Sequence, residues 1–194
     1  VTRELLAEFG KSPAYFRHPY LHTGTSLETK TALESFLTGN NYRVAPVSID
    51  NSEWIFARAY VLALRAGDDE TAARIGRDYV DYMLQMVAYY EDQSQQLFGR
   101  NIAHVLLIHA NQLNADWFAA LVDRLVGLDY EFVSLDEALA DPAYQSEDTY
   151  TGPGGITWLH RWAMTRKVDR SMFRGEPETP AYVLELTRLP EHSY

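Results

Sequence analysis

Three polar residues follow expected strands of this chain, and their types suit acid–base chemistry. Arg17 follows "AYF", Asp50 follows "RVAPVSI" and His109 follows "HVLLI". A histidine titrates near neutral pH, and a neighbouring carboxylate would fix its tautomer and favour its protonated form. An arginine can bind another carboxylate or a developing oxyanion. If the fold brings the three side chains together, we expect a site that moves protons.

Each of these residues also has an ordinary structural role. Arg17 could form a surface ion pair, and His109 could be a hydrogen-bonded histidine at a strand end. Asp50, with Asn51 and Ser52, could cap the helix that follows. Taken alone, Asp50 is explained better as a helix cap than as a catalytic residue. For Arg17 and His109, the sequence supports the structural role and the chemical role equally.

An alternation of extended and helical patterns would position these residues. The apolar patterns predict extended segments at residues 15–20, 42–50, 104–109 and 130–134. They predict helices at residues 1–10, 27–39, 54–65, 69–98, 114–127 and 135–140. Such alternation favours a parallel sheet covered by helices, either a small open sheet or half of a (β/α) barrel. In both folds, functional side chains lie beyond the C-terminal ends of the strands.

The composition is that of one acidic globular domain. The 194 residues are 46% hydrophobic and carry a formal net charge of −10, with no cluster of Lys or Arg. A nucleic-acid or anionic-membrane partner is therefore not expected. The chain has no cysteine, which excludes disulfides, thiol catalysis and Cys-ligated zinc but leaves the compartment open. No apolar run reaches the roughly 18 residues that span a bilayer.

The chain starts directly with a helical pattern. Val1 is followed by Thr2 as a plausible N-cap, and Gly10 would end the helix. We therefore expect a fragment, a processed product or one piece of a larger polypeptide.

Three short motifs resemble those of polysaccharide deacetylases of the NodB-homology type, which are similar to carbohydrate esterase family 4. "FRHPY" resembles their Arg-x-Pro-Tyr motif, "DNSEW" their Asp-x-x-Asp-Trp motif and "LIH" their Leu-x-His motif, in the family's order. The resemblance runs from Val1 to about Tyr144. It implies that residues 1–144 form the C-terminal half of a distorted (β/α) barrel, with residues 145–194 as a loop and C-terminal extension packed on the same domain.

The resemblance implies metal-dependent hydrolysis of an N-acetyl group on a polysaccharide or peptidoglycan amino sugar. His109 would be the general acid that protonates the leaving amine, Asp50 the carboxylate that orients and charges it, and Arg17 a contact of the catalytic base. The backbone at Tyr20 would help to hold the oxyanion. The side chains that wall the pocket for the acetyl methyl group would be Trp54 and Leu107.

The family's metal ligands are expected outside this chain. Its Thr-Phe-Asp-Asp strand and His-x-x-x-His helix would lie upstream of Val1, so a divalent metal, with zinc the first choice, would be held by a missing N-terminal half. That half and an N-acetylated carbohydrate are the expected partners. The family implies a periplasmic or secreted protein.

Two local patterns need separate interpretation. Glu53 stands where the family has aspartate, and we expect it to affect the helix start more than the chemistry, because Asp50 takes the charge-relay role. His18 and His22 have the spacing of a zinc pair, but Pro19 disfavours a helical His18, so the two rings need not share a face. Residues 14–24 are therefore explained better as part of a catalytic site than as a metal site.

Three alternatives remain open. The chain could be a catalytically inactive carbohydrate-binding relative, because the family's ligands are missing. It could be a related hydrolase of other non-peptide C–N bonds, including cyclic amides. It could also be an unrelated small α/β domain in which Arg17, Asp50 and His109 never meet.

Overall fold

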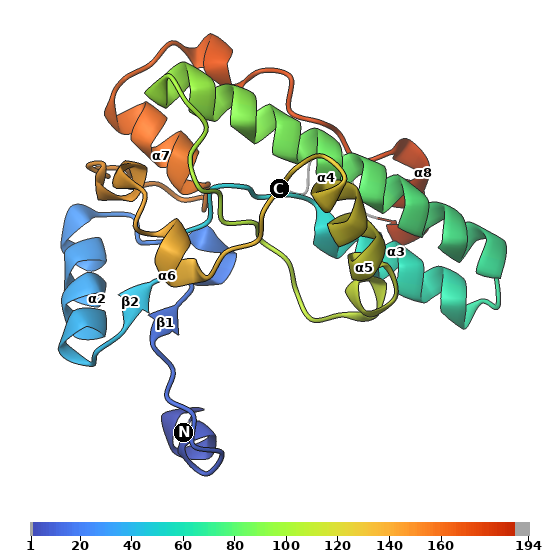
Figure 1. The fold of residues 1–194 in the computed structure, drawn as a ribbon, viewed down its shortest axis with the longest axis horizontal. Coiled ribbons are helices and arrows are strands. Elements are labelled where there is room, and N and C mark those ends of the chain that lie inside the picture. The colour runs from blue at the N-terminus through green and yellow to red at the C-terminus, as the bar shows by residue number, and fades with distance from the viewer. Residues whose placement is uncertain (1, 189–194) are drawn as a thin grey trace.

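The computed structural model describes residues 2–188, of which 57% are helical and 3% are strand (Figure 1). The α-helices are α1 (Thr2–Ala7), α2 (Leu27–Gly39), α3 (Glu53–Arg65), α4 (Asp69–Phe98), α5 (Gln112–Val126), α6 (Leu135–Ala138), α7 (Trp158–Thr165) and α8 (Ala181–Thr187). The 3-10 helices are η1 (Pro19–Leu21), η2 (Pro142–Gln145) and η3 (Arg170–Phe173). The strands are β1 (Tyr15–Phe16) and β2 (Arg43–Val44).

The expected half of a distorted (β/α) barrel is wrong. In the part of the chain that the structure describes, β1 and β2 form a two-stranded parallel sheet, and Ile49 and Leu106 form an isolated parallel bridge. The expected strand at residues 130–134 is absent, and Phe132 and Val133 within it are exposed. An extended segment becomes a strand only when a neighbour satisfies its backbone groups, and no other segment among residues 2–188 pairs with residues 131–133.

The main helices begin and end close to the sequence predictions, because each has clear end signals. Asp68 accepts a hydrogen bond from the Thr71 backbone N–H at the start of α4, and Gly99, with a φ of 69°, ends it in the left-handed conformation. Asn111 caps α5 in the same way as Asp68 caps α4. The predicted helices at residues 27–39, 54–65, 69–98 and 114–127 are thus confirmed.

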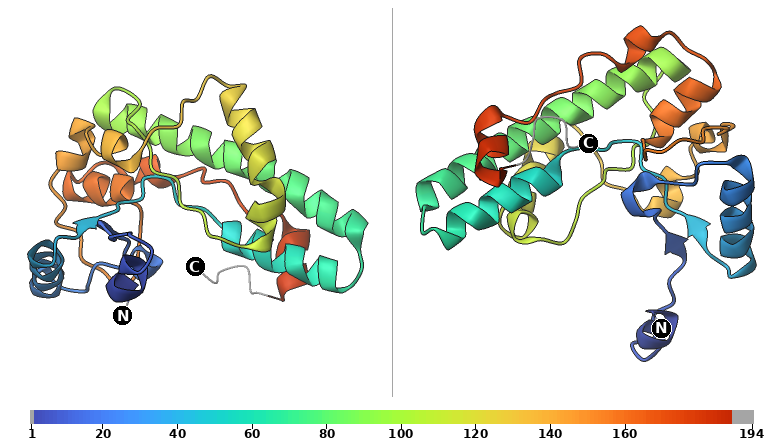
Figure 2. Two further views of the ribbon diagram at one scale, coloured as in Figure 1. Left: turned by 60° about the horizontal axis from the view of Figure 1, so that its bottom comes forward. Right: turned by 180° about the vertical axis from the view of Figure 1, so that it is seen from behind.

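The long helix α4 forms the centre of the core. It contacts α3 and α5 and, further along, α7, while α3 also contacts α8 (Figures 1 and 2). Its buried face repeats at helical spacing through Ile75, Tyr79, Met83, Met86 and Tyr90. This stripe is therefore part of the core.

Two extended segments pass side by side through the interior and lead to the site. The Ser48 and Ile49 backbone N–H groups donate to the Val105 carbonyl, and the Leu107 N–H donates to the Ile49 carbonyl. Both segments run in the same direction, so Asp50 and His109 leave the core at the same end.

The C-terminal segment wraps back over this framework. Helix α7 contacts α4, and the Trp162 ring is buried with edge-on contacts to Phe98 and Tyr144, at centroid distances of 5.7 and 5.4 Å. By contrast, α1 projects away from the other helices in Figure 1 and in the right-hand view of Figure 2. No helix of the described chain combines the length and apolar character needed to cross a membrane.

Gly76 in α4 tests the close packing of α4 and α5. A Cβ built on Gly76 would overlap the indole of Trp117 on α5, whereas one on Gly39, at the end of α2, would meet nothing within 4 Å. We expect Gly76→Ala to destabilise the fold by about 1–3 kcal/mol through overpacking. Gly39→Ala should stabilise it by about 0.4–1 kcal/mol. Urea unfolding followed by circular dichroism measures both, and equal shifts in the two variants would contradict the close approach of the helices.

Candidate active site

A buried carboxylate and an exposed imidazole form the centre of the candidate site. Glu53, the first residue of α3, is 1% exposed, and its Oε2 lies 2.7 Å from Nδ1 of His109, whose side chain is 57% exposed. Because an ionised carboxylate can only accept, Nδ1 carries the proton in this hydrogen bond. The tautomer and orientation of His109 are thus fixed from the inside of the protein, while much of the ring faces solvent.

Two asparagines complete the coordination of the Glu53 carboxylate. Its Oε1 accepts from Asn111 Nδ2 and from Asn114 Nδ2, the latter at 2.9 Å. Asn114 also donates to the His109 carbonyl at 2.8 Å and accepts from the Tyr79 hydroxyl at 2.7 Å. Burial and the charge of Glu53 raise the pKa of Tyr79, so its hydroxyl stays protonated and able to donate. The pair is therefore held by α3, α4 and α5 together.

The structure places Glu53, and not the expected Asp50, in hydrogen-bond contact with His109. The signal was present in the sequence, because Glu53 occupies the second acidic position of "DNSEW", directly before Trp54. Glu53 was expected to affect the helix start more than the chemistry; it is the first residue of α3, and its carboxylate, 1% exposed, also accepts hydrogen bonds from three side-chain donors.

Asp50 is half-buried beside this pair. Its Oδ1 accepts a hydrogen bond from the Asn51 backbone N–H at 2.9 Å. Burial raises the pKa of Asp50, and this effect exceeds the opposing influence of the Asn51 N–H and the His109 charge. Asp50 is not the cap of α3, because the side chain that accepts from the Glu53 N–H is Asn51, at 2.9 Å.

A second carboxylate near Asp50 could not be expected from the sequence. Glu176 follows η3 in a stretch without a motif, and burial together with the charge of Asp50 raises its pKa. Both carboxylates also act on the Tyr90 hydroxyl, whose pKa burial raises. Two carboxyl groups so placed resist being ionised at the same time.

Arg17 does not join the His109–Glu53 pair. It is half-buried in the wall of a cavity of about 540 Å³, and burial lowers the pKa of its guanidinium. Tyr20 is 93% exposed, and its backbone has a φ of 54° in the left-handed region. Its carbonyl packs so closely on Gly155 that any side chain at position 155 would overlap it.

The two expected pocket-wall residues are close in sequence to the members of the pair. Trp54 follows Glu53 in α3 and is exposed, while Leu107 precedes His109 by two residues and is half-buried. Asn51 Nδ2 donates to the Leu107 carbonyl at 2.8 Å, which joins the two chain segments. As expected, His18 before Pro19 is extended, with a φ of −62° and a ψ of 125°, so His18 and His22 do not share a helix face.

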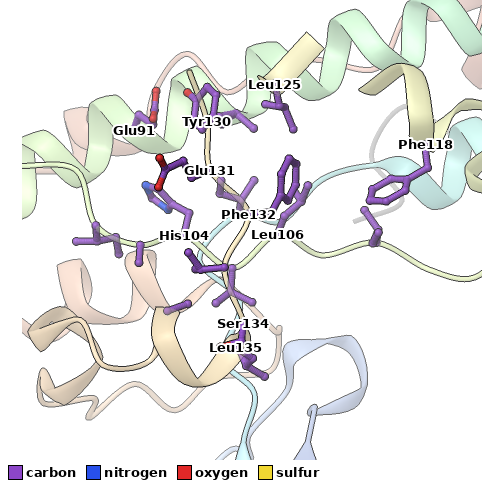
Figure 3. A pocket seen from close by; sticks show the side chains of 18 of the residues that line it. Glu91, His104, Leu106, Phe118, Leu125, Tyr130, Glu131, Phe132, Ser134 and Leu135 are labelled. Atoms are coloured by element: carbon purple, nitrogen blue, oxygen red, sulfur yellow. The ribbon is translucent and has the colours of Figure 1, made fainter. Parts of the chain in front are cut away.

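The cavity beside Arg17 is mostly apolar and lies between residues 102–108 and the segment 130–135 (Figure 3). Leu106, Phe118, Leu125 and Phe132 lie around it, with His104 and Glu131 near one end. His104 Nδ1 lies 3.1 Å from the Ser48 hydroxyl, and burial lowers the pKa of His104 to about 4. Its Nε2 is buried without a partner in the described chain.

Comparison with protein-family models, with curated proteins and with solved structures finds no match to this chain.

The buried position of Asp50 predicts a stability that depends on pH. Because the pKa of Asp50 is raised in the fold, its contribution is fully present below its ordinary pKa of 3.8 and is lost as the pH rises through the higher folded pKa. Asp50→Asn removes this loss, so its unfolding free energy relative to wild type should increase between pH 3.5 and 7. Chemical unfolding across that range measures the difference. Asp123→Asn, on the exposed side of α5, is the control, and a difference that stays constant with pH for Asp50→Asn would contradict the assignment.

Proposed function

We propose that this chain is part of a metal-dependent hydrolase that removes N-acetyl groups from a polysaccharide or peptidoglycan amino sugar. The observation that carries the proposal is the hydrogen bond between the exposed His109 imidazole and the buried Glu53 carboxylate, which join the motifs "LIH" and "DNSEW". This pairing supports a proton-transfer role, because a buried carboxylate both orients an imidazole and stabilises its protonated form. We place the reaction in the periplasm or outside the cell.

In the proposed reaction, His109 is the general acid. Protonated His109 donates its Nε2 proton to the amide nitrogen of the sugar while the bond from that nitrogen to the acetyl carbon breaks. Water supplies the oxygen that makes the acetyl group into acetate, and the amino sugar leaves as an amine. Glu53 stabilises the imidazolium through Nδ1, and Asp50 adds negative charge nearby when it is ionised.

Other side chains around the pair have proposed roles in substrate binding. Trp54 follows Glu53 in the sequence and Leu107 precedes His109 by two residues, and in the proposal their side chains enclose the acetyl methyl group. Tyr20 would help to hold the oxyanion through its backbone, and Arg17 would contact the carboxylate that acts as the base. Arg17 and Tyr20 lie on the loop at residues 17–24, which is held separately from the pair.

The described residues do not fit the metal ion of this reaction on their own. Within residues 2–188, no group of three or more His, Asp or Glu side chains is arranged to hold a metal. In the proposal, the ligands of the divalent metal, zinc for preference, belong to a further segment of the same domain. The steps given above involve only residues of this chain.

The apolar cavity supports the presence of such a segment. Within residues 2–188, the backbone groups of residues 131–133 form no backbone hydrogen bond, and Phe132 and Val133 are exposed beside the cavity. An unpaired extended segment next to apolar side chains is a ready edge for another extended segment. The further segment would therefore pack between residues 102–108 and 130–135.

A catalytically inactive carbohydrate-binding relative is the second candidate. It is favoured by the same lack of a metal-holding group within residues 2–188. Exposed Trp54 could then stack on a sugar ring without any reaction. Chitin or peptidoglycan oligomers that bind and release no acetate would support this function, whereas opening of a cyclic amide would support the related C–N hydrolase.

The proposed role of His109 is tested in the complete protein. We expect His109→Ala to lower the kcat for acetate release from chitin oligomers by about 10²–10⁴-fold, the usual contribution of a general acid, with no loss of bound metal. Glu53→Gln should lower kcat as well and shift the pH profile, because His109 loses its carboxylate partner. Glu70→Gln, on the exposed start of α4, is the matched carboxylate control and should leave kcat unchanged. Wild-type kcat in folded His109→Ala would remove this residue from the mechanism.

A further inference from the structure

A buried cluster of charged residues joins the loop at residues 17–24 to α7. Arg161 on α7 is fully buried, and its Nε donates to Asp148 Oδ2 at 2.8 Å. Lys30 on α2 is also buried, and its Nζ lies 2.8 Å from the same carboxylate oxygen. Arg161 Nη2 donates to the Thr23 hydroxyl and, at 3.3 Å, to the Tyr150 carbonyl.

The charges in this cluster do not balance. Lys30 and Arg161 bring two positive charges, and within residues 2–188 both form their ion pair with the single carboxylate of Asp148. Lys30 Nζ also donates a hydrogen bond to the Asp148 backbone carbonyl at 2.5 Å, but this carbonyl carries no negative charge. A buried charge without a counter-charge is strongly unfavourable, so the cluster leaves room for one anion.

Two buried nitrogen atoms of the cluster also lack a hydrogen-bond partner within residues 2–188. They are Arg161 Nη1 and His18 Nδ1, on side chains that are 0% and 2% exposed. Both side chains flank Trp158: the guanidinium carbon of Arg161 lies 5.0 Å from its ring centroid, and the His18 ring lies 6.0 Å away. The charges of Arg161 and Lys30 lower the pKa of His18, in addition to the larger effect of burial, so these groups share one environment.

A small cavity borders the cluster on the side of Lys30. It has a volume of about 280 Å³, and its walls include Lys30, Asp148 and Trp158, together with the carboxylate-bearing Glu34, whereas Arg161 and His18 lie behind this wall. A small ion could therefore approach the cluster from the side of Lys30. Buried donors beside a polar cavity are the usual features of an anion site.

We propose that Arg161, Lys30 and His18 bind a small oxyanion, either a carboxylate or a tetrahedral phosphate or sulfate. Arg161 Nη1 donates to it, His18 donates through Nδ1, and Lys30 supplies the balancing charge. The bound ion ties the loop that carries Arg17 and Tyr20 to α7. This site is independent of the proposed hydrolase chemistry, since none of its three ligands belongs to the His109–Glu53 pair.

The test is isothermal titration of the purified chain with sodium phosphate, sodium sulfate and sodium acetate, at ionic strength matched with sodium chloride. We expect one saturable site for at least one of the three and a rise in the melting temperature in the same salt. Selective phosphate and sulfate binding would assign a tetrahedral ion, and selective acetate binding a carboxylate.

Variants separate this site from general ion effects. Lys30→Gln and Arg161→Lys should each weaken binding at least tenfold, the second because it keeps the charge but removes Nη1. Arg124→Gln removes an exposed arginine on α5 and should leave the affinity unchanged. If Arg161→Lys does not fold, the anion affinities of Lys30→Gln and His18→Asn test the proposal. Binding that is absent for all three salts up to about 50 mM, or equal in the variants and wild type, would overturn the proposal.

Discussion

The burial of one carboxylate, that of Glu53, is the constraint around which the candidate site is arranged. A buried anion is tolerated only when donors surround it, and breaking such a pair costs about 3–5 kcal/mol. Here the donors are the side chains of His109, Asn111 and Asn114. Their hydrogen bonds hold residues 109–114 against the start of α3. Glu53 is also the first residue of α3, where the positive end of the helix dipole favours a negative charge. The orientation of His109 is thus a consequence of how the carboxylate is satisfied.

That arrangement depends in turn on α4. The buried face of α4 from Ile75 to Tyr90 is mainly apolar, but two of its tyrosines form hydrogen bonds. Tyr79 donates to Asn114, and the Tyr82 hydroxyl accepts from the Ser52 backbone N–H at 3.0 Å. The same helix that forms the core therefore contacts the starts of both α3 and α5. Packing and site geometry are coupled here, because a shift of α4 would move the donors and the carboxylate relative to each other.

The sequence predicted local features well and long-range pairing poorly. Helices α2 to α5 follow from apolar periodicity, which acts within a few residues, although the cap of α5 is Asn111 and not the expected Asn114, which lies in the first turn of that helix. Strands depend on partners distant in the chain, so the alternating pattern at 130–134 could not reveal that its backbone would stay unpaired. The structure brings residues of "DNSEW" and "LIH" into contact through Glu53 and not through the expected Asp50, because the partner of His109 depends on where α3 starts. Glu176 and Arg161 lay outside any motif, and tertiary contacts alone give them neighbours.

The loop at residues 17–24 shows why the C-terminal segment matters to a site built from earlier residues. Tyr20 and Leu21 both have a φ of 54°, which is unfavourable for residues with side chains and persists only where the surroundings impose it. The surroundings in this case are Gly155, which admits the Tyr20 carbonyl because it has no side chain, and Arg161, which holds Thr23. Both belong to the segment after residue 144. The contacts that determine the loop conformation therefore join residues that are farther apart in the sequence than Glu53 and His109 are. Because the loop and the His109–Glu53 pair depend on different residues, a substitution in one can leave the other unchanged.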